Sequence, residues 1–385
     1  MLRQVEVEHE FGLVLCPFDV LVFLFRILLL FCLLVSQAHR SPIMNSSNTT
    51  ASSNVGVVLE LMTWGKEGTE GARVHTIKDC EGMLDIFQKH GLNELDTAFV
   101  YASTHRTLGS RCSARYVKKR GPVVGTKLYP SKTSDGTPIT HSRADLRKFL
   151  DMQLEACKTT CFDIWYLLEL IHILFDAPDR KTDFHGSFAA GDELYREGEF
   201  KRFGISNYMS WEVAHIVGLC EKNDWIKPTA YQGYRIYTAL HRNVEPELFP
   251  CLRKFGISFY QFNPLARGLF TGRYSSLDMQ VEKGSRFDPA TGQGQGYRKR
   301  YFNDHYFEAL ALIEPVAKKN NLTMCEVALR WINHHSCDQI LFGASSYSRL
   351  ESNLVDLLEK GDSSPRKSSR SSMQRGRSFV LLLPK

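Results

Sequence analysis

Short apolar runs rich in β-branched residues alternate with longer amphipathic stretches through most of this 385-residue chain. This alternation limits the fold more strongly than any other feature of the sequence. The eight runs of strand length are Val57–Met62, Glu94–Ala98, Val123–Lys127, Phe162–Leu167, Phe203–Ser206, Thr229–Gln232, Ile257–Phe262 and Gln339–Gly343. Stretches with helical periodicity between them include Cys80–His90, Arg143–Cys157, Ser210–Asn223 and Phe307–Asn320. The pattern predicts parallel βαβ units that close into an α/β fold, a (β/α)8 TIM barrel.

Local signals support this assignment. Ser210 is a candidate N-cap for its helix, and Thr323 and Glu326 have the spacing of a capping box before Val327–His334. An open doubly wound sheet is the alternative fold. It would need a GxGxxG turn after the first strand, and the sequence has none there.

Charge is distributed unevenly along the chain. The net charge is +6, from 48 basic and 42 acidic side chains, but residues 361–385 hold six basic groups against one acidic group. The rest is therefore close to neutral and lacks the basic footprint of a nucleic-acid-binding protein. Ten cysteines are scattered without CxxC pairs or zinc-ligand spacing, which predicts a reduced intracellular protein without a metal site.

The first 56 residues differ from the rest of the chain. Residues 20–35 are apolar except for Arg26, but this run is shorter than the ~20 residues that a membrane-spanning helix needs. Two interpretations remain open. Translation starting at Met44 would give a cytoplasmic protein, whereas a genuine segment 20–35 would anchor the protein to a membrane or direct its secretion. The acidic first ten residues disfavour a signal peptide.

Polar side chains occur at the ends of predicted strands, where the active sites of barrels gather. Asp96 lies in the second strand run, Tyr101 follows five residues later, and Lys127 ends the third run. A lysine ammonium about 4 Å from a tyrosine hydroxyl would lower the tyrosine pKa by about 3 units at an effective dielectric of about 20. We therefore predict a proton-relay site in which Asp96 keeps Lys127 charged. The alternative is that these residues only form hydrogen bonds at the barrel mouth.

Seven segments between about 57 and 360 carry a family resemblance. They are LDTAFVY, VVGTK, FGISNYMSWEVAHIV, TAYQG, FNPLARGLFTGRY, GSRFDP and LFGASSYSRLESNL. In this order they resemble the aldo-keto reductases, especially fungal members of the branch similar to aflatoxin aldehyde reductase. The resemblance implies a barrel that binds NADPH without a Rossmann motif and reduces small aldehydes or ketones to alcohols. A homodimer is a further possibility.

The resemblance assigns roles to individual residues. Asp96, Tyr101 and Lys127 match catalytic positions, with Tyr101 as the proton donor to the carbonyl oxygen. The residues at cofactor-binding positions are Met62, Ser206, Asn207, Gln232, Phe262, Leu265, Gly268, Leu269, Ser345, Arg349 and Asn353. Within this set, Ser206, Asn207 and Gln232 match the residues that bind the nicotinamide carboxamide. Arg349 suits a 2′-phosphate, because a guanidinium pairs with phosphate oxygens in a two-pronged geometry.

The sequence departs from the family pattern after the fourth strand. The family pattern YLHAPDR has a histidine there, whereas here Leu167 is followed by LELIHILFD before Ala177. His172 lies inside this insertion and is a catalytic candidate as a substitute for the missing oxyanion donor, whose loss costs about 10²–10³-fold in rate. Two functions are compatible with this departure: an active NADPH-dependent reductase, or an impaired NADPH-binding barrel that serves as a sensor or partner subunit. A gene product that does not fold is the third interpretation.

Smaller departures occur elsewhere. Glu60 replaces a small residue in the first strand, and Arg267 replaces a glycine in the PLAGG turn. Residues 361–385 are either a basic, serine-rich disordered tail or an out-of-frame translation. Back-translation of residues 365–376 with a shift of one base gives PEEVVEVVDAEG, which resembles the helix expected at this point in the family. The insertion after Leu167 is open to a similar explanation as retained intron sequence.

Overall fold

The computed structural model describes residues 55–69, 71–99, 101, 121–133, 136–168, 182–233, 237–335 and 338–359. Eight parallel strands close into a barrel in the order β1-β10-β9-β8-β7-β6-β3-β2. They are β1 (Gly56–Glu60), β2 (Glu94–Asp96), β3 (Val123–Leu128), β6 (Phe162–Leu168), β7 (Phe200–Ser206), β8 (Pro228–Gln232), β9 (Ser258–Phe262) and β10 (Gln339–Phe342). The predicted (β/α)8 barrel is confirmed, and each strand lies within a few residues of its predicted run.

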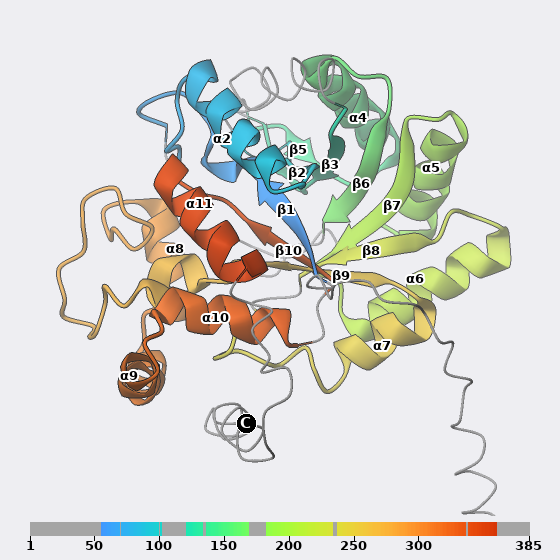
Figure 1. Ribbon diagram of the computed structural model, residues 1–385. Helices are drawn as coiled ribbons and strands as arrows, with labels where there is room; N and C mark the ends of the chain where they lie inside the picture. Colours follow the sequence, from blue (N-terminus) through green and yellow to red (C-terminus); the bar gives the residue numbers. More distant parts are fainter. Residues whose placement is uncertain are drawn as a thin grey trace, which may run out of the picture. The chain divides into compact units, whose positions relative to one another are not determined.

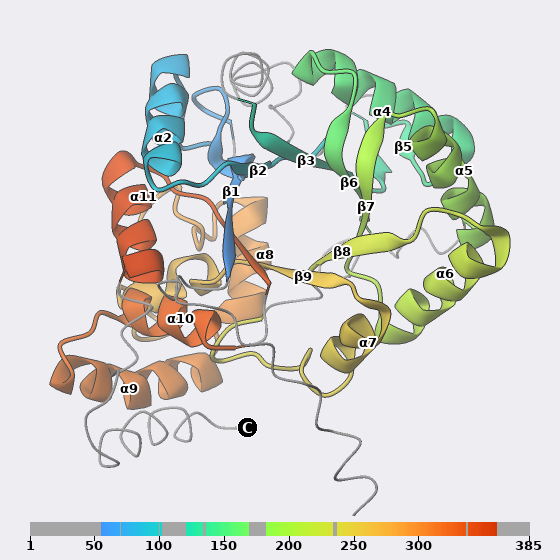
Figure 2. The same ribbon diagram turned by 45° about the vertical axis from the view of Figure 1, so that its right-hand side comes forward.

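Helices surround the strands on the outside of the barrel (Figures 1 and 2). They are α2 (Ile77–Lys89), α4 (Arg143–Cys157), α5 (Phe184–Arg196), α6 (Ser210–Asn223), α7 (Leu248–Phe255), α8 (Gly292–Tyr301), α9 (Asp304–Lys319), α10 (Met324–Asn333) and α11 (Tyr347–Leu354). Short helical turns η1 (Leu61–Thr63), η2 (Ala266–Thr271) and η3 (Val355–Glu359) follow β1, β9 and α11. In the described part of the chain, no helix has the length and apolar character required to cross a membrane.

Two groups of buried side chains hold the barrel together. The large group lies between the strands and the outer helices, and the small group fills the barrel interior. The interior group consists of Val58, Ile164, Tyr166, Ala230, Tyr260 and Leu341. The rings of Tyr166 and Tyr260 meet edge to face, with centroids 6.2 Å apart. A Cβ atom at Gly204 would lie 2.2 Å from the Tyr166 ring, so glycine on β7 leaves the room that this large side chain needs.

Side-chain caps define several helix starts. The capping box at Thr323 is confirmed: its hydroxyl accepts a hydrogen bond from Glu326 N at 3.1 Å, and the Glu326 carboxylate accepts one from Thr323 N at 2.7 Å. The prediction of Ser210 as an N-cap is wrong, because Ser210 is the first residue of α6 and Met209 precedes it. The Glu212 carboxylate accepts a hydrogen bond from Met209 N at 2.7 Å, while the Ser210 hydroxyl donates to Glu247.

A small antiparallel hairpin was not predicted. Its strands β4 (Ser131–Lys132) and β5 (Pro138–Ile139) lie between β3 and α4. The proposed membrane segment 20–35, the candidate His172 and the tail from residue 361 onward lie outside the described residues.

Candidate active site and cofactor cavity

Barrel closure brings the ends of strands that are far apart in sequence to one mouth. In the strand register Glu60 of β1 lies opposite Asp96 of β2, and Ser206 of β7 lies opposite Gln232 of β8. Lys127 of β3 lies next to the end of β6. Parallel strands present their carboxyl ends on the same side, so these polar side chains share one end of the barrel.

Asp96, Lys127 and Gln232 form a buried polar cluster at this mouth. Lys127 Nζ donates to both carboxylate oxygens of Asp96, at 2.7 Å to Oδ1 and 2.5 Å to Oδ2. The exposed fractions of the two side chains are only 5% and 3%. Gln232 Nε2 also donates to Asp96 Oδ1, at 2.9 Å. The amide that the resemblance assigns to the nicotinamide carboxamide thus helps to hold Asp96 in this structure.

Tyr101 lies beside this cluster and is tied to the first strand. Its hydroxyl donates to Glu60 Oε1 at 3.1 Å, and Lys127 Nζ lies 5.3 Å from the centroid of its ring. Tyr101, Lys127 and Asp96 are therefore neighbours, as the sequence predicted.

The electrostatic environment of Tyr101 differs from the prediction. Burial raises the pKa of Tyr101 well above 10, and the negative charges of Glu60 and Asp96 raise it further, while Arg267 acts in the opposite direction. The prediction that Lys127 lowers the pKa of Tyr101 is wrong, because the Lys127 ammonium donates its hydrogen bonds to Asp96. Burial also raises the pKa of Asp96, which Lys127 partly offsets. Tyr101 thus remains a neutral phenol at physiological pH.

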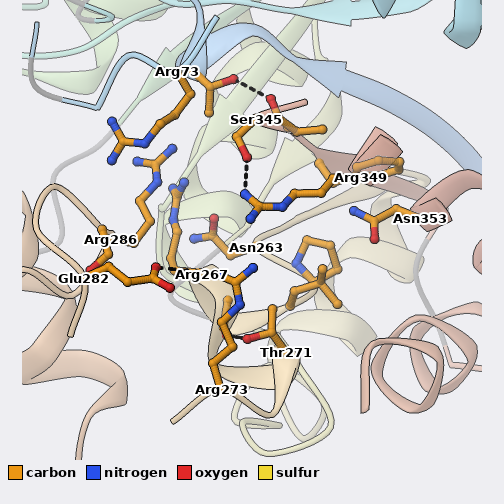
Figure 3. Close-up of a pocket in the computed structure, with 18 of the residues that line it drawn as sticks. Arg73, Asn263, Arg267, Thr271, Arg273, Glu282, Arg286, Ser345, Arg349 and Asn353 are labelled. Atoms are coloured by element: carbon orange, nitrogen blue, oxygen red, sulfur yellow. Dashed lines mark hydrogen bonds and ion pairs between the residues drawn. The ribbon is translucent and has the colours of Figure 1, made fainter. Parts of the chain in front are cut away.

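A cavity of about 360 Å³ opens next to Glu60. Its wall is formed by η1, η2 and the segments around residues 73, 282–286 and 342–353. Its charged lining residues are Glu60, Arg73, Arg267, Arg273, Glu282, Lys283, Arg286 and Arg349. Figure 3 labels all of them except Glu60 and Lys283. Six cationic groups against two carboxylates give the cavity an excess of positive charge, as a site for a polyanionic ligand requires.

Two arginines in this cavity have a buried charge or a buried N–H group that nearby acidic groups in the described residues do not fully satisfy. Burial and the nearby charge of Arg267 lower the pKa of Arg286 to about 10, and its guanidinium donates to the neutral amide oxygen of Gln293 at 2.8 Å. Within the described residues, the buried Nε of Arg267 has no hydrogen-bond partner. A phosphate group would relieve both conditions, since charge-assisted hydrogen bonds from guanidinium to phosphate are strong.

The candidate cofactor residues fall into two groups. Leu265, Gly268, Ser345, Arg349 and Asn353 line the cavity. Arg349 Nη1 donates to the hydroxyl of Ser345; Arg349 lies in the first turn of α11, and Ser345 lies two residues before the helix (Figure 3). The amino end of a helix favours anions, which suits a phosphate at this position.

The other candidates lie outside the lining of that cavity. Ser206 is buried at the end of β7, and Asn207 follows it with a left-handed backbone (φ 68°). Phe262 ends β9 and packs against Gly233, where an added Cβ would lie 2.1 Å from its ring. Met62 lies in η1, and its sulfur accepts a hydrogen bond from Arg267 Nη1 at 3.6 Å. Leu269 is fully buried in the outer core.

The end of β6 carries an apolar residue at one of the two positions that align with the histidine of the family pattern, and the other, Asp176, lies outside the described residues. Leu168 is the last residue of the strand and lies opposite Ser206 in the register. His172 and residues 169–181 lie outside the described residues.

Several cavity residues were missed by sequence reasoning. Asn263 and Arg286 lie within the quoted segments FNPLARGLFTGRY and GSRFDP but had received no role, although those segments carried the family signal. Arg73 and Glu282 had no sequence signal at all. They reach the cavity from loops whose course only the folded chain reveals.

The Asp96–Lys127 pair provides a stability prediction. Replacing Lys127 with methionine should lower the free energy of unfolding by about 3–5 kcal/mol, because the substitution leaves a buried carboxylate without its counter-charge. The double variant Lys127→Met/Asp96→Asn removes both charges and should recover part of that loss. Urea denaturation of both variants measures the difference. A single variant as stable as the parent would show that the pair contributes nothing to folding.

Comparison with known proteins points to one family. The sequence model of the Aldo/keto reductase family matches residues 61–360. An aldo-keto reductase of Pseudocercospora fijiensis is 44% identical over 72% of this chain and 91% of its own length. The aldo-keto reductase pigE of Monascus ruber is 42% identical over 75% of this chain and 85% of its own. Aflatoxin B1 aldehyde reductase member 2 of Rattus norvegicus is 37% identical over 78% of this chain and 79% of its own length.

Proposed function

Because the chain belongs to the aldo/keto reductase family, an oxidoreductase family that acts on carbonyl compounds with NAD(P)H, we propose that it reduces small aldehydes or ketones to alcohols, with NADPH as cofactor and Tyr101 as proton donor. The observation that carries this proposal is the position of Glu60. Its carboxylate accepts the hydrogen bond of Tyr101 and also lines the cationic cavity. Glu60 therefore connects the proposed proton donor to the cationic cavity, which supports a phosphorylated cofactor there.

When bound, NADPH supplies the hydride that adds to the carbonyl carbon. Ser345 and Arg349 would hold its 2′-phosphate, and Arg267 and Arg286 would neutralise phosphate charge in the same cavity. Tyr101 would donate its hydroxyl proton to the carbonyl oxygen as negative charge develops there. Lys127 and Asp96 keep a fixed pair of charges beside the ring of Tyr101, which preorganises the mouth for that transfer.

The preference for NADPH over NADH gives a direct test. Replacing Arg349 with alanine should weaken NADPH binding by about 10–100-fold, the value of one charge-assisted hydrogen bond. NADH binding should change little, because NADH lacks the 2′-phosphate. Fluorescence titration of both cofactors measures the two affinities. Arg253→Ala, which removes an arginine paired with Asp338 at 2.8 Å and absent from the cavity lining, is the matched control. Equal losses for the two cofactors would refute the role of Arg349.

A second function is favoured by one observation. Leu168 at the end of β6 offers no hydrogen-bond donor where the family pattern has a histidine. A barrel that binds NADPH with little turnover would then act as a sensor or partner subunit. Parallel measurement of NADPH affinity and of NADPH oxidation with a nitrobenzaldehyde separates the two functions: the proposed reductase shows both binding and aldehyde-dependent oxidation, whereas the binding barrel shows only the first.

A further inference from the structure

Two residues that depart from the family pattern meet at the barrel mouth. Glu60 ends β1, and Arg267 lies in η2 after β9. Arg267 Nη1 lies 3.9 Å from Glu60 Oε2, and the exposed fractions of the two side chains are 10% and 8%. A small residue and a glycine would occupy these positions in the family pattern. The two replacements are thus complementary in charge and in contact.

Glu60 joins this ion pair to the proposed proton donor. Its Oε1 accepts the hydroxyl hydrogen of Tyr101 at 3.1 Å, while its Oε2 faces Arg267. One carboxylate therefore bridges the phenol and the guanidinium. A buried carboxylate is stable only when its oxygens have partners, and within the described residues Tyr101 and Arg267 are the partners recorded for its two side-chain oxygens.

Arg267 has a backbone conformation that residues other than glycine seldom adopt, and contacts of its side chain hold it there. Arg267 has φ 58° and ψ 21°, in the left-handed region that favours glycine. Its guanidinium lies 4.8 Å from the centroid of the Tyr297 ring and 3.6 Å from the Met62 sulfur. These contacts keep the charged group directed at Glu60 and away from solvent.

We propose that Glu60 and Arg267 are positioning residues for the reduction: Glu60 orients the hydroxyl of Tyr101 at the mouth until a carbonyl oxygen takes over its hydrogen bond, and Arg267 holds the Glu60 carboxylate in place. The inference rests on the proposed role of Tyr101 as proton donor. It adds to that donor a carboxylate that holds its hydroxyl and a guanidinium that faces this carboxylate.

The charges that face Tyr101 come from four elements. They are Glu60 of β1, Asp96 of β2, Lys127 of β3 and Arg267 of η2. Behind them, Tyr297 and Tyr301 act on Arg267, and Arg267 and Glu60 in turn act on Arg286. Burial and the two carboxylates raise the pKa of Tyr101, and Arg267 lowers it. The neutral phenol is the form that donates a proton, so a raised pKa extends activity to higher pH.

Removing each charge should therefore move the pH profile in opposite directions. With Glu60→Gln one of the charges that raise the pKa of Tyr101 disappears, so the basic limb of kcat/KM should begin at a lower pH than in the parent. With Arg267→Gly the charge that lowers this pKa disappears, and the limb should move to higher pH. In the double variant the limb should return toward the parental position. Arg267→Gly also relieves the left-handed backbone, so this variant should fold.

The experiment uses the full chain and two readouts. The first is the pH profile of NADPH oxidation with a nitrobenzaldehyde. The second is ¹³C NMR of protein labelled at tyrosine Cζ, which follows ionisation of Tyr101 without turnover, with Tyr101→Phe to assign the resonance. Glu221→Gln is the matched control, because Glu221 pairs with Lys227 at 3.1 Å on the exposed surface and should leave both readouts unchanged.

The outcomes separate the inference from the proposed function. Opposite shifts for Glu60→Gln and Arg267→Gly support the inference. Ionisation of Tyr101 in Glu60→Gln at no lower pH than in Arg267→Gly would overturn it, even if Tyr101→Phe is inactive and the proposed function stands. Full activity of Tyr101→Phe would instead remove the proposed proton donor.

Discussion

Replacing Tyr101 with phenylalanine is expected to lower the rate of carbonyl reduction by about 10²–10⁴-fold, the usual contribution of one general acid. NADPH affinity should remain nearly unchanged, because the hydroxyl is directed at Glu60 and contributes no group to the phosphate-binding end of the cavity. Single-turnover rates at saturating NADPH, with binding followed by fluorescence, separate the two effects.

A matched variant controls for the loss of a tyrosine hydroxyl elsewhere in the protein. Tyr347→Phe removes another tyrosine hydroxyl, which donates to Asp79 at 3.1 Å on the exposed surface, and should leave the rate as it is. If the Tyr101→Phe protein reduces aldehydes at the parental rate, Tyr101 is not the acid and the assignment of the whole mouth fails.

The second large effect concerns the insertion after β6. Deleting residues 168–175 and introducing Asp176→His recreates the family's YLHAPDR and should raise the reduction rate by about 10²–10³-fold, the value of one oxyanion donor. An ionised aspartate at that position only accepts hydrogen bonds and would repel the developing oxyanion. The parental chain is expected to be a slow reductase, because Leu168 at the strand end carries no donor.

Two further variants make this result interpretable. The deletion alone, with Asp176 retained, should gain little rate, which isolates the contribution of the imidazole from that of the shorter loop. His172→Ala in the parental chain should also change little. A parental rate equal to that of the repaired chain, or a large loss in His172→Ala, would show that another donor already serves and that the interpretation of the insertion is wrong.

The barrel was predictable because its signal is local. Run length and β-branched composition located each strand, and the boundaries of Arg143–Cys157 and Ser210–Asn223 agree with α4 and α6. The cap of α6 was not predictable, because the Glu212 carboxylate accepts from Met209 N while the Ser210 hydroxyl donates to Glu247, which is distant in sequence. A sequence pattern identifies candidate capping residues, but the contacts made in the folded chain determine which of them caps the helix.

The grouping of three candidate catalytic residues was predictable from the sequence, and the charges around them were less so. Asp96, Tyr101 and Lys127 lie together, as strand-end positions imply. The direction of the tyrosine pKa was mispredicted, because Glu60 reaches Tyr101 only when the barrel closes β1 beside β2. The arginines of the cavity come from separate loops and a helix start, so their convergence depends on tertiary structure that no local pattern encodes.

We propose that this chain transfers hydride from NADPH to a carbonyl carbon. Incubating the full chain with a nitrobenzaldehyde and NADPH deuterated at C4, separately on each face, tests that claim most directly. We predict that the benzyl alcohol carries one deuterium at its carbinol carbon from one of the two labelled cofactors, with one NADPH consumed per alcohol formed. NADPH binding with no labelled alcohol above the level of a protein-free reaction would contradict the account.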